Sequence, residues 1–182
     1  MARLILLNGA PGSGKSTLAK AFTADRPLSL ALDIDSVRGM LGGWLDHPTE
    51  SGLAARELAL AMAGVHLRSG RVVVVPQFLG RLDFVLRLEA LALEVGVPFI
   101  EVALISDVEE AVSRFLSRAD APETQEHRDA AALQERSGGV DQLRTMYARL
   151  LEVVAARPAT RTVLTVPGEI DVTYGRLLAA IG

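Results

Sequence analysis

The chain has 182 residues, a length that fits one domain with a sizeable buried core. A net charge of −3 excludes an overall positive field for nucleic acid, and the absence of cysteine excludes disulfides, thiol catalysis and cysteine metal sites. No apolar run approaches the roughly 20 residues that cross a bilayer, and the N-terminus lacks the pattern of a signal peptide, so we expect a cytoplasmic protein.

Strand-like and helix-like segments alternate along the chain, with no linker, repeat or low-complexity stretch between them. We predict five strands, at residues 3–8, 28–33, 71–75, 99–105 and 161–166. We predict helices at residues 15–24, 50–69, 82–95, 106–118, 140–156 and 172–181, and a short one from Ser36. This order predicts an α/β fold with a five-stranded parallel sheet between two helix layers, in a single domain spanning residues 1–182.

The stretch after the fourth predicted strand contains a helix start and then a polar segment. Ser106 and Glu109 have the S-x-x-E spacing of a capping box, which predicts a helix that runs to about Arg118. Residues 119–139 are polar, include Pro122 and end in two glycines. We expect this segment to be a mobile lid over the carboxyl ends of the strands, where ligands of parallel sheets bind.

A glycine-rich motif lies between the first predicted strand and the first predicted helix. It reads Gly-Ala-Pro-Gly-Ser-Gly-Lys-Ser and matches the G-x-x-x-x-G-K-[ST] pattern of a P-loop. Backbone N–H groups of such a loop, together with the helix N-terminus, hold the phosphates of a nucleotide. We therefore expect ATP or GTP to bind along Gly9, Ala10, Pro11, Gly12, Ser13, Gly14, Lys15, Ser16 and Thr17.

Two side chains of this loop carry specific chemistry. Lys15 is one of two lysines among 19 basic residues, so the chain otherwise uses arginine for positive charge. A compact ammonium at this position is expected to bridge the β- and γ-phosphates. The hydroxyl of Ser16 is expected to bind the Mg²⁺ ion of the nucleotide.

Two carboxylates and an arginine follow the second predicted strand. If the strand persists that far, alternation points Asp33 and Asp35 to the same side, and Arg38 lies one turn into the next helix. A phosphate acceptor needs a carboxylate that orients its hydroxyl and takes its proton, which Asp35 can supply. Asp33 and Arg38 are then candidates for substrate binding. The alternative is an ordinary helix N-cap at Asp35 with an exposed arginine.

Three sequence blocks resemble a family of P-loop kinases. They are N-G-A-P-G-S-G-K-S-T at 8–17, D-S-V-R at 35–38 and R-T-M-Y at 144–147. Together they look like the kinase module of polynucleotide 5′-kinases. The first two are also similar to zeta-toxin-type kinases, chloramphenicol phosphotransferases and the gluconate kinase group.

The resemblance implies roles for individual residues. Asp35 would be the general base, Arg38 an acceptor ligand, and lid arginines would reach the transferring phosphate. Arg114 and Arg118, spaced i, i+4 on the helix that enters the lid, match that position. A solvated helix face is the alternative for these two arginines.

The chain also departs from such kinases, which often have an acidic residue after the third strand. Gln77 stands there in this chain and can hydrogen-bond a substrate or water but supplies no charge. Arg81 lies just beyond and either faces the acceptor or begins the next helix. The three histidines lack zinc-ligand spacing, so we expect no metal except magnesium.

These patterns predict an ATP-dependent phosphotransferase that acts on a hydroxyl of a small molecule, a nucleotide or a nucleic-acid 5′ end. Acidic residues in the predicted lid do not favour a long nucleic-acid backbone. The alternative is a nucleotide-binding switch or slow NTPase without a phosphate acceptor, which the neutral Gln77 makes plausible. The sequence leaves open the acceptor, the choice between ATP and GTP and the oligomeric state.

Overall fold

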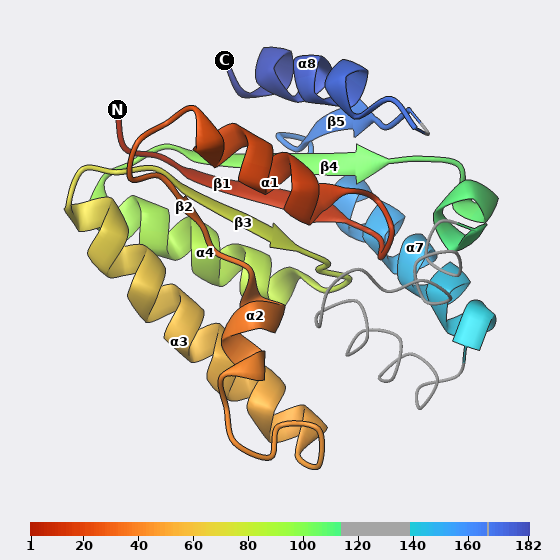
Figure 1. Ribbon diagram of the computed structural model, residues 1–182, viewed down its shortest axis with the longest axis horizontal. Coiled ribbons are helices and arrows are strands. Elements are labelled where there is room, and N and C mark those ends of the chain that lie inside the picture. The colour runs from red at the N-terminus through yellow and green to blue at the C-terminus, as the bar shows by residue number, and fades with distance from the viewer. Residues whose placement is uncertain (114–138, 167) are drawn as a thin grey trace.

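A computed structural model describes residues 1–113, 139–166 and 168–182, and these residues form the expected three-layer α/β fold (Figure 1). The strands make one parallel sheet in the order β2-β3-β1-β4-β5. They are β1 (Leu4–Gly9), β2 (Leu30–Ala31), β3 (Val73–Gln77), β4 (Phe99–Ile105) and β5 (Arg161–Leu164). The helices are α1 (Lys15–Ala24), α2 (Ile34–Gly39), α3 (Pro48–Arg68), α4 (Leu82–Val95), α7 (Gly139–Ala155) and α8 (Ile170–Ile181).

The central strand β1 divides its side chains between two cores. Leu4 and Leu6 point toward α3 and α4, while Ile5 and Leu7 point toward α1 and α8. All four side chains are fully buried, as a strand with neighbours on both edges and helices on both faces requires. Each such leucine or isoleucine stabilises the fold by about 1.5–3 kcal/mol. These two cores fix the carboxyl end of β1, where the P-loop starts.

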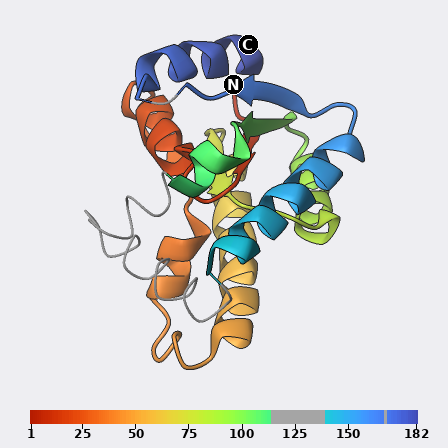
Figure 2. The same cartoon turned by 90° about the vertical axis from the view of Figure 1, so that its right-hand side faces the viewer.

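Figure 2 looks onto the carboxyl ends of the strands, with α2 and α7 on either side of the view. The P-loop follows the carboxyl end of β1, which is the central strand and lies between β3 and β4. The site is therefore built where the crossover direction reverses, as expected for an open parallel sheet. In the ranges that the structure describes, no helix is both long and apolar enough to cross a membrane.

Two local predictions were wrong. The second strand spans only Leu30–Ala31, because α2 already begins at Ile34 with Asp33 as its N-cap. The helix after β4 is capped by Asp107 and not by Ser106: the Asp107 carboxylate accepts hydrogen bonds from the N–H groups of Glu109 and Glu110. Aspartate and serine are comparable N-caps, so adjacent Ser106 and Asp107 leave the start of the helix ambiguous in the sequence.

The predicted lid at residues 119–139 and the lid arginines Arg114 and Arg118 lie outside the described residues, except for Gly139 at the start of α7. Their proposed roles stay predictions.

A buried asparagine holds the loop that follows β3. Asn8 donates a hydrogen bond from Nδ2 to the carbonyl of Leu79 (3.0 Å) and accepts one at Oδ1 from the N–H of Leu79 (2.9 Å). Asn8 is fully buried and is the only asparagine in the chain. Its side chain therefore takes the place of a strand partner for Leu79 and fixes the backbone between β3 and α4.

Asn8→Ala is expected to lower the free energy of unfolding by about 2–3 kcal/mol, because it leaves the N–H and the carbonyl of Leu79 buried without partners. Urea denaturation of the two proteins measures the difference. Gln142→Ala, which removes a half-buried side-chain amide from α7, should cost under about 0.5 kcal/mol. Equal losses in the two variants would show that the Asn8 bonds do not anchor this loop.

Candidate functional site

The P-loop has the backbone shape of an anion-binding loop. Gly12 and Gly14 have φ values of 88° and 84°, in the left-handed region that favours glycine. Gly14 is also the N-cap of α1, and no side chain caps this helix. The N–H groups of the first turn are therefore available to phosphate oxygens, and the positive end of the helix dipole adds to the attraction.

The loop is tightly packed at its first glycine. A Cβ atom at Gly9 would lie 2.5 Å from the Oγ of Ser13, closer than any normal contact. Ser13 is 4% exposed, and its hydroxyl has no hydrogen-bond partner in the described part of the chain. A buried hydroxyl donor without a protein partner, inside a glycine-rich loop, is compatible with an anionic ligand. These features suit the phosphates of a nucleotide.

Ser16 and Asp33 form a polar pair that joins α1 to the end of β2. The Ser16 hydroxyl donates to Oδ2 of Asp33 at 3.0 Å, and Oδ1 of Asp33 accepts from the N–H of Asp35. The sequence-based argument that put Asp33 and Asp35 on one strand face was wrong, since both belong to the start of α2. The N-cap is Asp33, so the alternative that Asp35 only caps the helix is also wrong.

Asp35 lies within the electrostatic influence of the P-loop. Protein atoms crowd its carboxylate, although part of the residue remains exposed to solvent. Desolvation raises the pKa of Asp35 above its ordinary value, and the Asp33 charge raises it further. The charges of Lys15 and Arg38 and a hydrogen bond from Gln77 oppose this rise in pKa without cancelling it. A carboxylate with a raised pKa beside a phosphate-binding lysine is suited to general-base work.

Gln77 reaches the same carboxylate from the neighbouring strand. Gln77 lies on β3 opposite Asn8 of β1, and Asn8 directly precedes the P-loop. Gln77 is therefore beside the start of the loop. Its side chain hydrogen-bonds Asp35, while its Oε1 is buried and has no partner among the described residues. Arg81 is exposed at the N-cap of α4, and no described contact joins it to Asp33 or Asp35.

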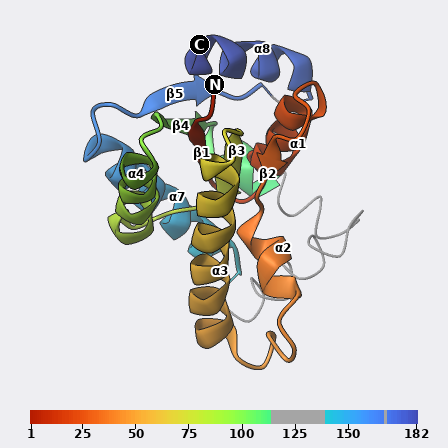
Figure 3. The ribbon, with the colours of Figure 1, turned by 90° about the vertical axis from the view of Figure 1, so that its left-hand side faces the viewer.

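Arg38, on α2, contacts the first turn of α3. Figure 3 shows α2 beside α3 and the loop that joins them. The Nε of Arg38 donates to the Ser51 hydroxyl at 3.0 Å, and its second terminal nitrogen donates to the carbonyl of Pro48 at 2.5 Å. Its guanidinium carbon lies 5.1 Å from the centroid of the Trp44 ring. Arg38 therefore fixes Trp44 and the start of α3, and it still influences Asp35 through its charge.

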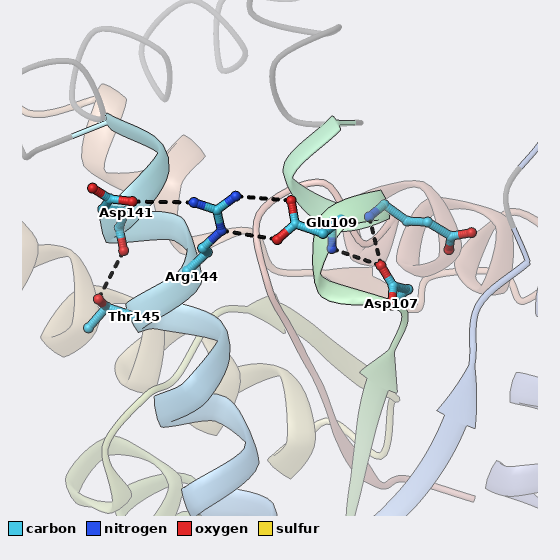
Figure 4. Close-up of polar contacts among 6 residues, drawn as sticks. Asp107, Glu109, Asp141, Arg144 and Thr145 are labelled. Atoms are coloured by element: carbon cyan, nitrogen blue, oxygen red, sulfur yellow. Dashed lines mark hydrogen bonds and ion pairs between the residues drawn. The ribbon is translucent and has the colours of Figure 1, made fainter.

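Residues of the R-T-M-Y block connect α7 to the end of β4. Arg144 makes a two-pronged ion pair with Glu109 at 3.0 Å and a further contact with Asp141 (Figure 4). The Tyr147 hydroxyl accepts from the N–H of Ser106 and donates to its carbonyl. Arg144 is thus engaged in a surface ion pair, and this block braces the fold beside the P-loop.

The Ser16 hydroxyl, which is the predicted magnesium ligand, lies 3.0 Å from a carboxylate oxygen of Asp33. Among the described residues there is no group of three or more histidine or acidic side chains that could hold a metal ion. Magnesium in nucleotide sites keeps several waters and takes few protein ligands, so the Ser16 and Asp33 oxygens fit it. The residues that sequence reasoning missed are Asn8 and Ser51, which accepts a hydrogen bond from Arg38. Asn8 had one available signal, as the single asparagine directly before the P-loop.

The fold resembles that of small P-loop kinases. The chain aligns with the tunicamycin resistance protein of Deinococcus radiodurans over 100% of its length and 96% of that protein, at 19% identity and a TM-score of 0.62. A gluconokinase from Sinorhizobium meliloti aligns over 97% of this chain and 90% of its own, at 18% identity and a TM-score of 0.60. No curated protein sequence matches the chain.

A family model gives the assignment of the chain itself. The model is described as an AAA domain, and it matches residues 4–143, which include the P-loop, Asp35 and Gln77. The match covers more than half of the chain and agrees with the nucleotide-binding geometry of the loop. The chain therefore belongs to this AAA-domain family of P-loop proteins.

Proposed function

We propose that the protein is a kinase that transfers the γ-phosphate of ATP to a hydroxyl group of a small molecule. The observation that carries this proposal is the position of Asp35. Its carboxylate has a raised pKa and lies close enough to Lys15 and Arg38 to respond to both charges. A loop built only to hold a nucleotide has no need of such a carboxylate.

The described residues divide the reaction between them. The backbone of the P-loop and Lys15 bind the β- and γ-phosphates and keep the γ-phosphorus in place. Asp35 takes the proton of the acceptor hydroxyl while the hydroxyl oxygen bonds to the γ-phosphorus. The bond between that phosphorus and the bridging oxygen breaks, and ADP leaves with the electron pair. A carboxylate with a raised pKa holds the transferred proton more strongly than an ordinary one.

Magnesium, when bound, neutralises charge on the transferring phosphoryl group. Ser16 would hold it directly and Asp33 through the water shell, since their oxygens already lie 3.0 Å apart. The carboxylate that serves the metal then comes from the end of β2. Asp33 thus offers the acidic group that is absent at Gln77.

Asp33→Asn should raise the magnesium concentration needed for half-maximal activity by about tenfold, with a smaller effect on turnover at saturating metal. The reason is that the amide keeps the N-cap bond to Asp35 but loses the negative charge. Magnesium titration of nucleotide binding by calorimetry gives a second measure that needs no turnover. An unchanged magnesium requirement would remove Asp33 from the metal site. Asp25→Asn at the C-cap of α1 is the matched control.

The acceptor is expected to be small. The gluconokinase neighbour is a small-molecule kinase by name, and we extend that class to this chain. Arg38, whose charge acts on Asp35, is engaged with Ser51 and Pro48, so it is not free to follow a nucleic-acid backbone. Incubation with γ-labelled ATP and panels of sugars, sugar acids, nucleosides and 5′-hydroxyl oligonucleotides tests the proposal. Label transferred only to water would support the slow NTPase instead.

A further inference from the structure

The two polar atoms of the Gln77 amide differ, because one makes a hydrogen bond and the other has no partner among the described residues. The side chain hydrogen-bonds the Asp35 carboxylate, so the amide nitrogen is the donor in that contact. Its Oε1 is buried and has no partner in the described part of the chain. A buried acceptor without a donor costs free energy comparable to a lost hydrogen bond, so a ligand that supplies the donor gains that energy on binding.

Neighbouring residues fix the position of this side chain. Gln77 is the last residue of β3, and the double hydrogen bond between Asn8 and Leu79 locks the chain two residues later. Gln77 also lies opposite Asn8 in the strand register, so Asn8 fixes the backbone at Gln77 and just after it. The sheet thus fixes the backbone of Gln77, and the hydrogen bond to Asp35 orients its amide, which is the preorganisation that a substrate-binding group needs.

We propose that Gln77 recognises the acceptor molecule. Its side-chain nitrogen orients Asp35, and its Oε1 accepts a hydrogen bond from a second donor group of the acceptor, next to the reacting hydroxyl. This inference rests on the proposed kinase function. The reacting hydroxyl has a single proton, and that proton goes to Asp35, so the same hydroxyl has none left for Oε1. The matching acceptor therefore carries a vicinal hydroxyl or amine, as polyols, sugars and amino alcohols do. In ATP hydrolysis, a water molecule with two O–H groups is expected to take the place of the acceptor and to donate to both oxygens.

A glutamate at position 77 would bring a third carboxylate close to Asp33 and Asp35. It would keep an oxygen acceptor but lose the N–H that binds Asp35. The neutral amide is therefore the side chain that serves both partners at once.

The contact with Asp35 is testable without turnover. The chain contains one asparagine and four glutamines, so the side-chain amide region of an NMR spectrum holds five pairs of signals. Gln77→Met identifies the Gln77 pair by its loss. Asp35→Asn should shift that pair, while Asp171→Asn, on α8, should leave it in place. An unshifted pair in Asp35→Asn overturns the proposal.

The acceptor contact is testable with MgATP and simple probes. Gln77→Met should lower kcat for ATP hydrolysis by about tenfold, the scale of one lost hydrogen bond, with KM for ATP unchanged. Gln77→Glu, which keeps the oxygen, should lose activity through Asp35. The wild type should phosphorylate glycerol faster than 1,3-propanediol, which lacks a neighbouring hydroxyl, and Gln77→Met should lose that preference.

The outcomes separate the two proposals. Unchanged turnover in Gln77→Met, or equal transfer to the two alcohols by the wild type, overturns the role of Gln77 and leaves the kinase function standing. A wild type that binds no MgATP by calorimetry contradicts the proposed function itself.

Discussion

Lys15→Ala is expected to abolish the thermal stabilisation that MgATP gives the wild type. A ligand at 100 times its Kd stabilises the native state by about 2.7 kcal/mol, which corresponds to a rise in Tm of roughly 5–10 °C for a chain of this size. Lys15 is the cation of the P-loop, and its Nζ folds over the loop to within 3.5 Å of the Ala10 carbonyl. Differential scanning fluorimetry with and without MgATP measures the shift.

The chain supplies a matched control for this experiment. Lys20 is its other lysine and is exposed on α1, one turn and a half from the loop. Lys20→Ala removes the same charge and should keep the full MgATP shift. A shift that survives in Lys15→Ala would mean that the nucleotide binds elsewhere.

Asp35→Asn should lower the rate of phosphate transfer by about 10²-fold or more, the usual effect of losing a general base. Affinity for MgATP should hardly change, because the loop holds the phosphates. Initial rates with labelled ATP and calorimetric titration of the nucleotide give the two quantities. Asp171→Asn, an exposed change on α8, should keep full activity. A fully active Asp35→Asn protein that binds ATP would end the assignment of Asp35 as the base.

The same variant has an expected effect on stability with a definite pH dependence. The pKa of Asp35 is raised in the folded protein, mainly by desolvation, so the ionised form is disfavoured there. The favourable contribution of this group is complete below the ordinary pKa of 3.8 and is lost as the pH rises through the folded value. Asp35→Asn should therefore have the higher Tm at neutral pH, with a difference that disappears in acid. On the acid side of its pH profile, kcat/KM should fall with an apparent pKa above the ordinary 3.8.

Much of the fold could be predicted because hydrophobic residues recur with a clear helix or strand period in most elements. The bounds of α1, α4 and β4 match the predicted ranges, since each element ends at a glycine or begins at a clear change of hydrophobic pattern. The start of α2 could not be predicted, because the strand-like Leu-Asp-Ile-Asp pattern continues past the point where Asp33 caps a helix. The hydrogen bond of the Asp33 cap sets the start of α2, and the pattern of hydrophobic residues carries no information on such a bond.

The site was predictable where one motif carries it and unpredictable where several elements converge. The P-loop geometry follows from its glycines, as the φ values of Gly12 and Gly14 show. The contact between Gln77 and Asp35 joins the ends of two different segments, and Arg38 turned out to bind Ser51 and Pro48. Such contacts depend on how α3 and β3 sit against each other, which a single sequence does not specify.

The contacts of α7 with the end of β4 join two segments that are separated in the sequence by residues 114–138. Glu109 precedes the undescribed stretch 114–138, and Arg144 follows it, yet their side chains form an ion pair (Figure 4). Tyr147 adds its bonds to Ser106, and β4 pairs directly with β5. The polypeptide on the two sides of that stretch is thus held together without relying on its covalent link. We expect that a backbone cut in that stretch would leave two fragments that stay associated.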